Sequence, residues 1–271
     1  MGWLADRALA CRLEAAHGWR GVRYVEAQAR LHPERLVAVE PLAGGVLLYG
    51  GEGSPLRYAT GLGLHGPVAP SDLDHLEHFY RSRGALPRLD VCPLAHPSLI
   101  ELLHLRSYVL NKFFSVLACR LPQDIVPASL PLDVRIARAT QVEAALWIKT
   151  TAQGFEETDT PSPEGLDLLA PNFYSADAIC FIAWVGGEPA GGGAIYLHEH
   201  AAELGGVSTR IAFRRRGVHH ALITARLEAA REYDCDLAVA LASPGSDSER
   251  NLARAGFHLA YTDAAVVGPS Q

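Results

Sequence analysis

A repeat within the chain is the feature that most constrains its fold. Residues 103–108 (LHLRSY) match residues 252–257 (LARAGF) at an offset of 149, and residues 89–94 match residues 236–241 at an offset of 147. Similarity that recurs at nearly the same spacing indicates two copies of one structural unit with small differences in loop length. A chance match between short segments is the alternative.

A proline-rich segment separates the two copies. The sequence LPQDIVPASLPLD, residues 121–133, carries three prolines, which neither a helix nor a central strand accommodates at this spacing. A length of 271 residues also suits two modest domains better than one. We therefore predict a first domain at 1–121, a linker at 122–132 and a second domain at 133–271.

Hydrophobic patterning predicts mixed α/β domains of the α+β type. In the second half we expect strands at 133–139, 178–185, 189–197, 202–209, 237–242 and from 257, and helices at 141–153, 163–169, 217–233 and 246–255. In the first half we expect strands at 36–39, 46–49, 56–60, 89–94 and from 108, and helices at 71–83 and 97–106. This order describes an antiparallel meander that leads into a parallel β-α-β unit.

Composition limits the class of protein. The net charge is −6, the hydrophobic fraction is 49% and the charged fraction is 20%, which excludes a disordered chain and argues against a nucleic-acid partner. Five widely spaced cysteines without a C-x-x-C pair suggest reduced thiols. The longest apolar run, residues 178–185, is far shorter than the ~20 residues that cross a bilayer. We expect a cytoplasmic protein without a membrane partner.

Four arginines gather just before the predicted helix at 217–233. Arg210, Arg214, Arg215 and Arg216 lie within seven residues and are followed by Gly217. Cations are unfavourable at the N-terminus of a helix unless an anion compensates for them, and the free N–H groups there bind phosphates. The pattern predicts a pyrophosphate site, with a solvated basic helix start as the alternative.

Two motifs in the second half resemble those of the GNAT superfamily of acetyl-CoA-dependent N-acetyltransferases. The family signature R/Q-x-x-G-x-G/A is similar to Arg214-x-x-Gly217-x-His219, from which His219 departs. A helix that ends in Gly256-Phe257 follows at the expected distance. The resemblance covers about residues 133–265.

The resemblance implies a fold with splayed central strands and a bound acetyl-CoA. The pantetheine arm would lie along the fourth strand of the domain, and main-chain N–H groups of the loop would hold the pyrophosphate. The cofactor-binding residues it implies are Val207, Ser208, Thr209, Arg214, Arg215, Arg216, Gly217, Val218, His219, His220 and Asn251.

The same resemblance suggests the catalytic groups of an N-acetyltransferase. Glu203 stands where several relatives place a general base, with a surface carboxylate as the alternative. Relatives often carry a tyrosine acid where this chain has Leu252, so Tyr261 is the substitute candidate, or a core tyrosine. We expect direct transfer of acetyl to a primary amine. A non-catalytic acyl-CoA-binding or regulatory module is the alternative.

The acceptor is expected to be a small-molecule or peptide amine. In this fold the loop between the first two helices of the domain, here 153–160, usually contacts the acceptor, and its three carboxylates would attract a cation. A solvated acidic loop explains them equally well. A homodimer is possible.

The first half resembles a degenerate copy without a cofactor site. Its loop at 61–72 has no arginine, and Asp72 and Asp74 occupy the start of the next helix, where carboxylates would fill the anion site. Gly61-x-Gly63-x-x-Gly66 matches the dinucleotide fingerprint, but the helix starts too late for a nicotinamide cofactor.

No metal site is predicted. His198 and His200 with Glu203 resemble a ligand pair on one strand face, but a hairpin tip explains them better.

Overall fold

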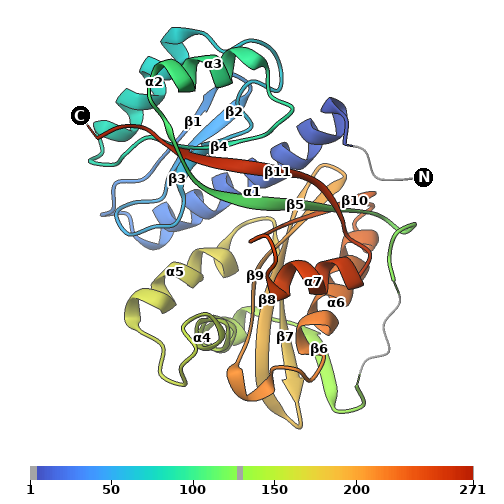
Figure 1. Cartoon of the computed structure of the whole chain (residues 1–271). Helices are drawn as coiled ribbons and strands as arrows, with labels where there is room; N and C mark the ends of the chain where they lie inside the picture. Colours follow the sequence, from blue (N-terminus) through green and yellow to red (C-terminus); the bar gives the residue numbers. More distant parts are fainter. Residues whose placement is uncertain (1–4, 127–130, 271) are drawn as a thin grey trace. The chain divides into compact units, whose positions relative to one another are not determined.

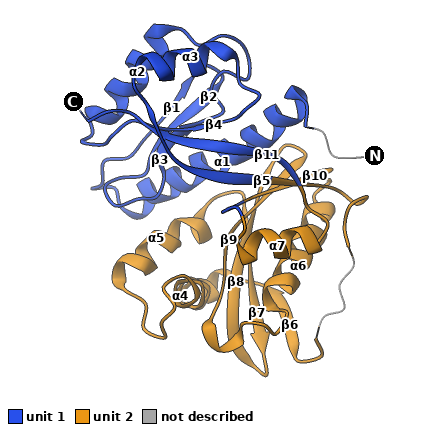
Figure 2. Cartoon of the chain, viewed as in Figure 1, with its two compact units in different colours: residues 1–116, 242–244, 259–271 blue, residues 117–241, 245–258 orange. Residues whose placement is uncertain are grey.

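The computed structural model describes residues 5–126 and 131–270 and divides the chain into two compact units (Figures 1 and 2). Unit 1 holds residues 1–116, 242–244 and 259–271, and unit 2 holds residues 117–241 and 245–258. The predicted linker at 122–132 falls partly on residues 127–130, which lie outside the described residues.

Unit 1 is a mixed sheet with helices. Its strand order is β1-β2-β3-β4-β11-β5, with antiparallel β1/β2, β2/β3 and β4/β11 pairs and a parallel β3/β4 pair. Its elements are α1 (Arg7–Leu31), β1 (Ala38–Leu42), β2 (Gly45–Tyr49), β3 (Arg57–Thr60), α2 (Pro70–Arg81), β4 (Arg88–Val91), α3 (Pro97–Leu105), most of β5 (Val109–Arg120) and most of β11 (His258–Val267).

The helix α1 is the one described α-helix that the sequence analysis missed. Asp6 caps it by accepting a hydrogen bond from the N–H of Leu9 at 2.8 Å. Its buried face includes Glu14, His17 and two glycines, so the apolar stripe that marks an amphipathic helix is broken. Within the described residues, no helix is long and apolar enough to cross a membrane.

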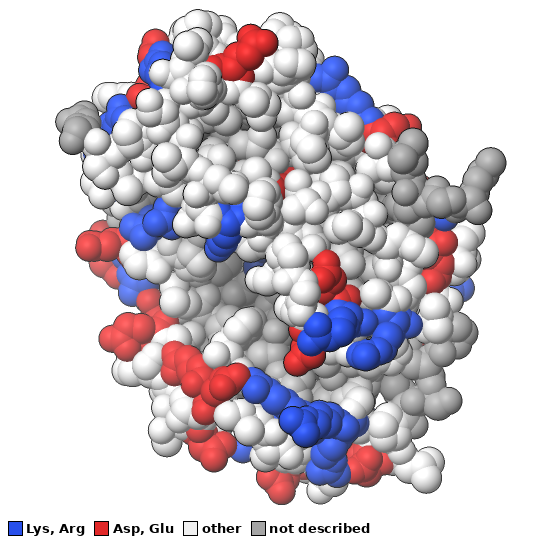
Figure 3. Space-filling view, viewed as in Figure 1, with Lys and Arg blue, Asp and Glu red and all other residues white. Residues whose placement is uncertain are grey.

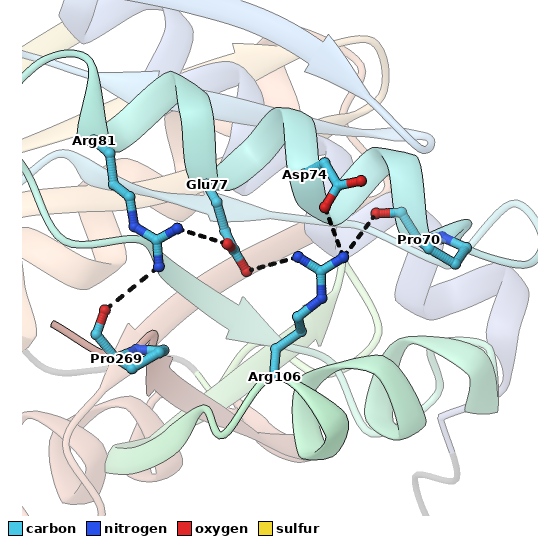
Figure 4. A network of polar contacts seen from close by, with 6 residues as sticks. All are labelled: Pro70, Asp74, Glu77, Arg81, Arg106 and Pro269. Carbon is cyan, nitrogen blue, oxygen red and sulfur yellow. Dashed lines mark hydrogen bonds and ion pairs between the residues drawn. The ribbon is translucent and has the colours of Figure 1, made fainter. Parts of the chain in front are cut away.

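A chain of ion pairs ties α2 to the end of α3 (Figure 4). Buried Glu77 accepts from Arg81 at 2.7 Å and from Arg106 at 3.4 Å, and Arg106 also bonds Asp74 at 2.6 Å. Arg81 reaches the carbonyl oxygen of Pro269 at 3.5 Å. These contacts join three segments of unit 1.

Within unit 2 the strand order is β5-β10-β9-β8-β7-β6. Its elements are the end of β5, β6 (Val134–Arg138), η1 (Gln141–Glu143), α4 (Ala144–Phe155), α5 (Pro163–Tyr174), β7 (Ala178–Val185), β8 (Glu188–His198), β9 (Ala201–Thr209), η2 (Ile211–Phe213), α6 (Val218–Glu232), β10 (Leu237–Ala242) and α7 (Asp247–Arg254). The predicted mixed α/β fold with an antiparallel meander and a β-α-β unit is confirmed, with element ends shifted by a few residues.

Three consecutive glycines in β8 let helices approach both faces of the sheet. A Cβ atom on Gly192 would lie 2.2 Å from Oγ1 of Thr151 on α4, whereas one on Gly193 would lie 3.3 Å from Cζ of Arg226 on α6. Successive strand residues point to opposite faces. Therefore α4 and α6 cover opposite faces of the sheet of unit 2 (Figure 1).

The last strand of the second half, β11, belongs mostly to unit 1. β11 ends the second half of the sequence, yet it pairs antiparallel with β4 of unit 1, from Ala264 opposite Val91 to Val267 opposite Arg88. Conversely, residues 117–120 of β5 belong to unit 2. The predicted domains are continuous in sequence, whereas the two observed units are not. The sequence could not reveal this difference, because an apolar strand pattern does not specify which sheet the strand joins.

Candidate functional site

The adjacent strands β9 and β10 are paired over only part of their length. Their parallel register joins Ala201, Ala202 and Glu203 to residues 237–239 and ends there, while β9 continues to Thr209. On its other edge, β9 stays paired with β8 as far as Thr209. This is the predicted splay of the central strands, and it leaves main-chain groups of the second half of β9 open to a ligand.

A bulge distorts β9 inside this open stretch. Ala194 of β8 lies opposite Gly205 and Gly192 lies opposite Ser208, so two residues of β9 face one of β8. Gly206, in the bulge, has a φ of +56°, a left-handed conformation that favours glycine. Val207, a predicted cofactor residue, is the other bulged position.

A buried arginine that the sequence analysis missed supports the bulge. Arg226 of α6 is 1% exposed, and its Nη1 donates to the carbonyl oxygens of Ala194 at 3.2 Å and Gly205 at 3.4 Å. Burial lowers the pKa of Arg226 to about 9, so the guanidinium stays charged at neutral pH. The sequence feature that could have indicated Arg226 is a basic residue among the apolar positions of the helix predicted at 217–233.

The start of α6 has the conformation expected of an anion site. Gly217 is the N-cap residue with a φ of +76°, and Arg215 also has a positive φ, of +60°. The first N–H groups of a helix have no acceptor within it, and the helix dipole adds positive potential there. The main-chain N–H groups of Val218, His219 and His220 are these groups.

Three of the four clustered arginines have acidic partners. Arg214 pairs with Glu157 at 2.8 Å, Arg210 with Asp159 at 3.0 Å, and Arg216 with Asp133. Figure 3 shows basic side chains next to acidic ones on the visible surface. Arg215 has no ion pair among the described residues. A phosphate must therefore compete with carboxylates of this chain for Arg214.

The acidic loop at 153–160 is used within unit 2. Glu157 forms an ion pair with Arg214, and Asp159 forms one with Arg210. Glu156 accepts hydrogen bonds from the backbone N–H and the hydroxyl of Ser162, the N-cap of α5. Each of the three carboxylates has a partner in the chain. The predicted attraction of an amine by this loop gains no support from this arrangement.

His219 and Asn251 lie together. Nδ2 of Asn251 is 3.1 Å from Nδ1 of His219, and burial, with smaller contributions from Arg226 and His220, lowers the pKa of His219 to about 4. The imidazole is therefore neutral at pH 7, and its Nδ1 accepts from the amide. The side chain that departs from the family signature is thus turned to α7.

The side chains of the two last β9 residues differ in their contacts. The hydroxyl of Ser208 donates to the carbonyl oxygen of Thr151 on α4 at 2.7 Å. The hydroxyl oxygen of Thr209 is buried and has no hydrogen-bond partner among the described residues. Ser208 therefore offers only its main chain to a ligand, whereas Thr209 also offers a hydroxyl.

The two predicted catalytic residues lie in different units. Glu203 is on β9, 2% exposed, opposite Tyr196 of β8 and within the paired part of β9 and β10. Tyr261 lies on β11 in unit 1, where its hydroxyl donates to Glu14 at 2.9 Å. Burial, reinforced by Glu14, raises the pKa of Tyr261 far above its ordinary value. Both roles remain predictions, and the tyrosine lies in a different unit from the Arg214 to Gly217 motif because β11 belongs mostly to unit 1.

The loop of unit 1 at the position of the anion site is closed by a carboxylate. α2 begins at Pro70, and Oδ2 of Asp72 accepts from the N–H of Ala69 at 2.8 Å. Gly61 and Gly63, both at a φ of +77°, precede this helix start without being part of it. The absence of a cofactor site in the first half remains a prediction.

Comparison with known proteins places this site in a family. Residues 143–257 match the profile of the Acetyltransferase (GNAT) family. No curated protein sequence matches the chain. The stretch at 143–257 is thus a GNAT acetyltransferase domain.

Solved structures share the fold of the whole chain. A GCN5-related N-acetyltransferase from Kribbella flavida has a TM-score of 0.68 at 18% identity, with 97% of this chain and 96% of that chain covered. A tandem GNAT protein from the clavulanic acid biosynthesis pathway has a TM-score of 0.61 at 14% identity, with 90% and 89% covered. A GNAT-family protein from Novosphingobium aromaticivorans has a TM-score of 0.53 at 15% identity, with 91% and 97% covered.

Proposed function

We propose that unit 2 transfers the acetyl group of acetyl-CoA to a primary amine. The observation that carries the proposal is the open edge of β9, which leads through η2 into the left-handed N-cap of α6 at Gly217. An extended pantetheine arm fits such an edge as an added strand, and a pyrophosphate fits the helix start. Members of the GNAT family use acetyl-CoA.

The charged groups at this end of unit 2 support binding of a polyanion. Arg215 is available without breaking an ion pair of the described residues, whereas Arg214 exchanges Glu157 for a phosphate. Surface ion pairs contribute at most about 1 kcal/mol, so this exchange is inexpensive. Arg226 adds a buried positive charge behind the bulge of β9, where its Nη1 donates to the carbonyl oxygen of Gly205.

The transfer requires an amine that attacks the thioester carbonyl carbon. A new C–N bond forms, the C–S bond breaks, and coenzyme A leaves as a thiolate that takes up a proton. Glu203 would accept a proton from the incoming ammonium group, because it lies on β9 before the open edge. Tyr261 gains no such support, since its hydroxyl is bound to Glu14.

Calorimetry with acetyl-CoA tests the cofactor. We expect one site per chain, with binding weakened in Arg214→Ala and unchanged in the control Arg138→Ala, an exposed arginine of β6 paired with Glu232. Ligand at 100 times its Kd should add about 2.7 kcal/mol to the stability of the unit that binds it. Two sites per chain would contradict the assignment of the site to unit 2 alone.

Release of free coenzyme A with a panel of amines tests the transfer. The acceptor is proposed to be a small-molecule or peptide amine. Glu203→Gln should lower kcat while the Kd for acetyl-CoA stays constant, and an unchanged kcat would remove Glu203 from the mechanism. Binding without release for every amine would favour the second candidate, an acyl-CoA-binding regulatory module, which the departure at His219 supports.

The surroundings of the reaction are part of the proposal. A cytoplasmic location, the absence of nucleic-acid and membrane partners and a possible homodimer remain expectations from the composition of the chain. Light scattering at several protein concentrations distinguishes a monomer from a dimer.

A further inference from the structure

Unit 1 contains a buried group of side chains that the proposed function does not use. Glu14 on α1, Cys92 just after β4 and Asp263 on β11 each present one ligand atom, and these atoms lie within 4.8 Å of one another. All three residues are buried. They come from distant parts of the sequence, so only the fold brings them together.

Asp263 indicates that this group lacks a partner. Its side chain is 1% exposed, and neither carboxylate oxygen accepts a hydrogen bond from a donor among the described residues. Burial and the adjacent Glu14 carboxylate raise the pKa of Asp263 to about 9. An ionised carboxylate that is buried alone costs several kcal/mol, and buried polar groups in native proteins are nearly always paired. A bound cation or a shared proton satisfies these oxygens.

Glu14 is held in place on its outer side. The hydroxyl of Tyr261 donates to Oε1 of Glu14 at 2.9 Å, and the hydroxyl of Thr60 donates to Oε2 at 2.7 Å. Each oxygen retains a lone pair after these bonds. Carboxylates that bind metals are commonly oriented by hydrogen bonds of this kind.

The spacing of the three ligand atoms suits a small ion. Three atoms within 4.8 Å of one another share a central point that is at most about 2.8 Å from each. Zinc binds thiolate at about 2.3 Å and carboxylate oxygen at about 2.0–2.2 Å, so shifts of roughly half an ångström complete the contacts. A thiolate in the set favours a zinc-type ion over magnesium or calcium.

We propose that Glu14, Cys92 and Asp263 of unit 1 bind a divalent transition-metal ion of the zinc type. A cavity of about 200 Å³ is lined in part by Glu14, whereas Cys92 and Asp263 are not among its lining residues. Cys11, Trp19, Thr60 and His65 are among the residues that line the cavity.

Metal titration of the full-length protein tests the proposal. The protein is freed of metal with a chelator, and Zn²⁺ alone and Co²⁺ alone are then added in separate calorimetric and absorbance titrations. We expect one ion per chain, a rise in Tm with Zn²⁺, and a sulfur-to-cobalt charge-transfer band in the near ultraviolet. These measurements use the wild-type chain and do not depend on whether a variant folds.

Matched variants identify the ligands. Cys92→Ser should abolish the charge-transfer band, and Asp263→Asn should weaken Zn²⁺ binding by at least about 100-fold. Cys11→Ser, which changes a thiol that lines the cavity but is outside the ligand set, should keep both the band and the affinity. Circular dichroism establishes that each variant is folded.

The same measurements can overturn the proposal. If wild-type protein gains no stability with Zn²⁺ and shows no thiolate band with Co²⁺, Glu14 and Asp263 share a proton instead. If the band survives in Cys92→Ser, another thiol is the ligand and the assigned site is wrong. Calorimetry with acetyl-CoA reports separately on unit 2, so failure of one proposal is distinguishable from failure of the other.

Discussion

The side-chain amide nitrogen of Asn251 lies 3.1 Å from Nδ1 of His219, which joins the first turn of α6 to α7. The two residues are 32 positions apart in the sequence. Because the contact draws the imidazole toward α7, a histidine can stand where the family signature has glycine or alanine. The contact also makes the neutral imidazole part of the folded structure.

The stability of the protein should therefore depend on His219 at mildly acidic pH. The ordinary histidine pKa of 6.5 is lowered to about 4 in the folded chain by burial. Between these values the unfolded chain binds the proton more readily, so stability is complete above pH 6.5 and falls as the pH drops toward 4. Relative to His219→Gln, which does not titrate, the wild type should lose about 2 kcal/mol between pH 6.5 and 4.5. Urea unfolding at both pH values measures the difference. An equal loss in both proteins would contradict it.

Substitution of Gly217 should damage the cofactor site more than the fold. An alanine there meets a φ of +76°, at a cost of about 1 kcal/mol, and its Cβ would lie 3.1 Å from Cγ of Pro131. The shift of the helix start misaligns the N–H groups, so acetyl-CoA affinity should fall at least about 10-fold.

Gly187 offers the matched control for this experiment. It has a φ of +87° in the β7–β8 turn and open space around its Cβ position. Gly187→Ala should cost similar stability and leave the Kd for acetyl-CoA unchanged. Equal affinity losses in both variants would mean that backbone strain, and not the position of the helix start, weakens binding.

Local patterns in the sequence predicted most helices and strands, and the reasons for the failures are physical. The helix start that follows the Arg214 to Gly217 motif could be predicted, because its conformation depends on a few neighbouring residues. α1 was missed because Glu14 and His17 interrupt its apolar face. The pairing of β11 with β4 depends on which sheet edge the strand joins, which no local pattern specifies.

The same limit applied to the functional residues. Tyr261 was assigned to the acetyl-transfer site because it closely follows Gly256-Phe257 in the chain, whereas the structure places this part of β11 in unit 1. The group of Glu14, Cys92 and Asp263 could not be predicted, because its members are far apart in the sequence and only the fold brings them together. Arg226 was readable only as a cation among apolar helix positions.

Removal of one carboxylate should strengthen cofactor binding. Glu157 pairs with Arg214 at 2.8 Å, and both side chains are substantially exposed. Glu157→Gln removes the ion pair of Arg214, which keeps only its hydrogen bonds to the carbonyl oxygens of Thr209 and Gly154. Because an exposed pair is worth less than about 1 kcal/mol, affinity for acetyl-CoA should rise about 2- to 5-fold. Calorimetry at low salt gives the clearest result. Glu164→Gln, an exposed change at the start of α5, is the control and should have no effect. A weaker Kd in Glu157→Gln would show that the pair positions Arg214 for the ligand.

Gly256 explains why a glycine precedes the last aromatic residue of the motif. It has a φ of +101°, and a Cβ atom there would lie 1.8 Å from the carbonyl oxygen of Asp124. Gly256→Ala should therefore cost about 3 kcal/mol or more, as the sum of backbone strain and the displacement of the 124–126 segment. Gly245 also has a positive φ, of +73°, but no atom lies within 4 Å of its Cβ position. Gly245→Ala should therefore cost only about 1 kcal/mol of stability. Urea unfolding of both variants measures the difference. If the two variants lose the same stability, the segment at Asp124 moves aside without a measurable cost, and Gly256 is required only for its positive φ.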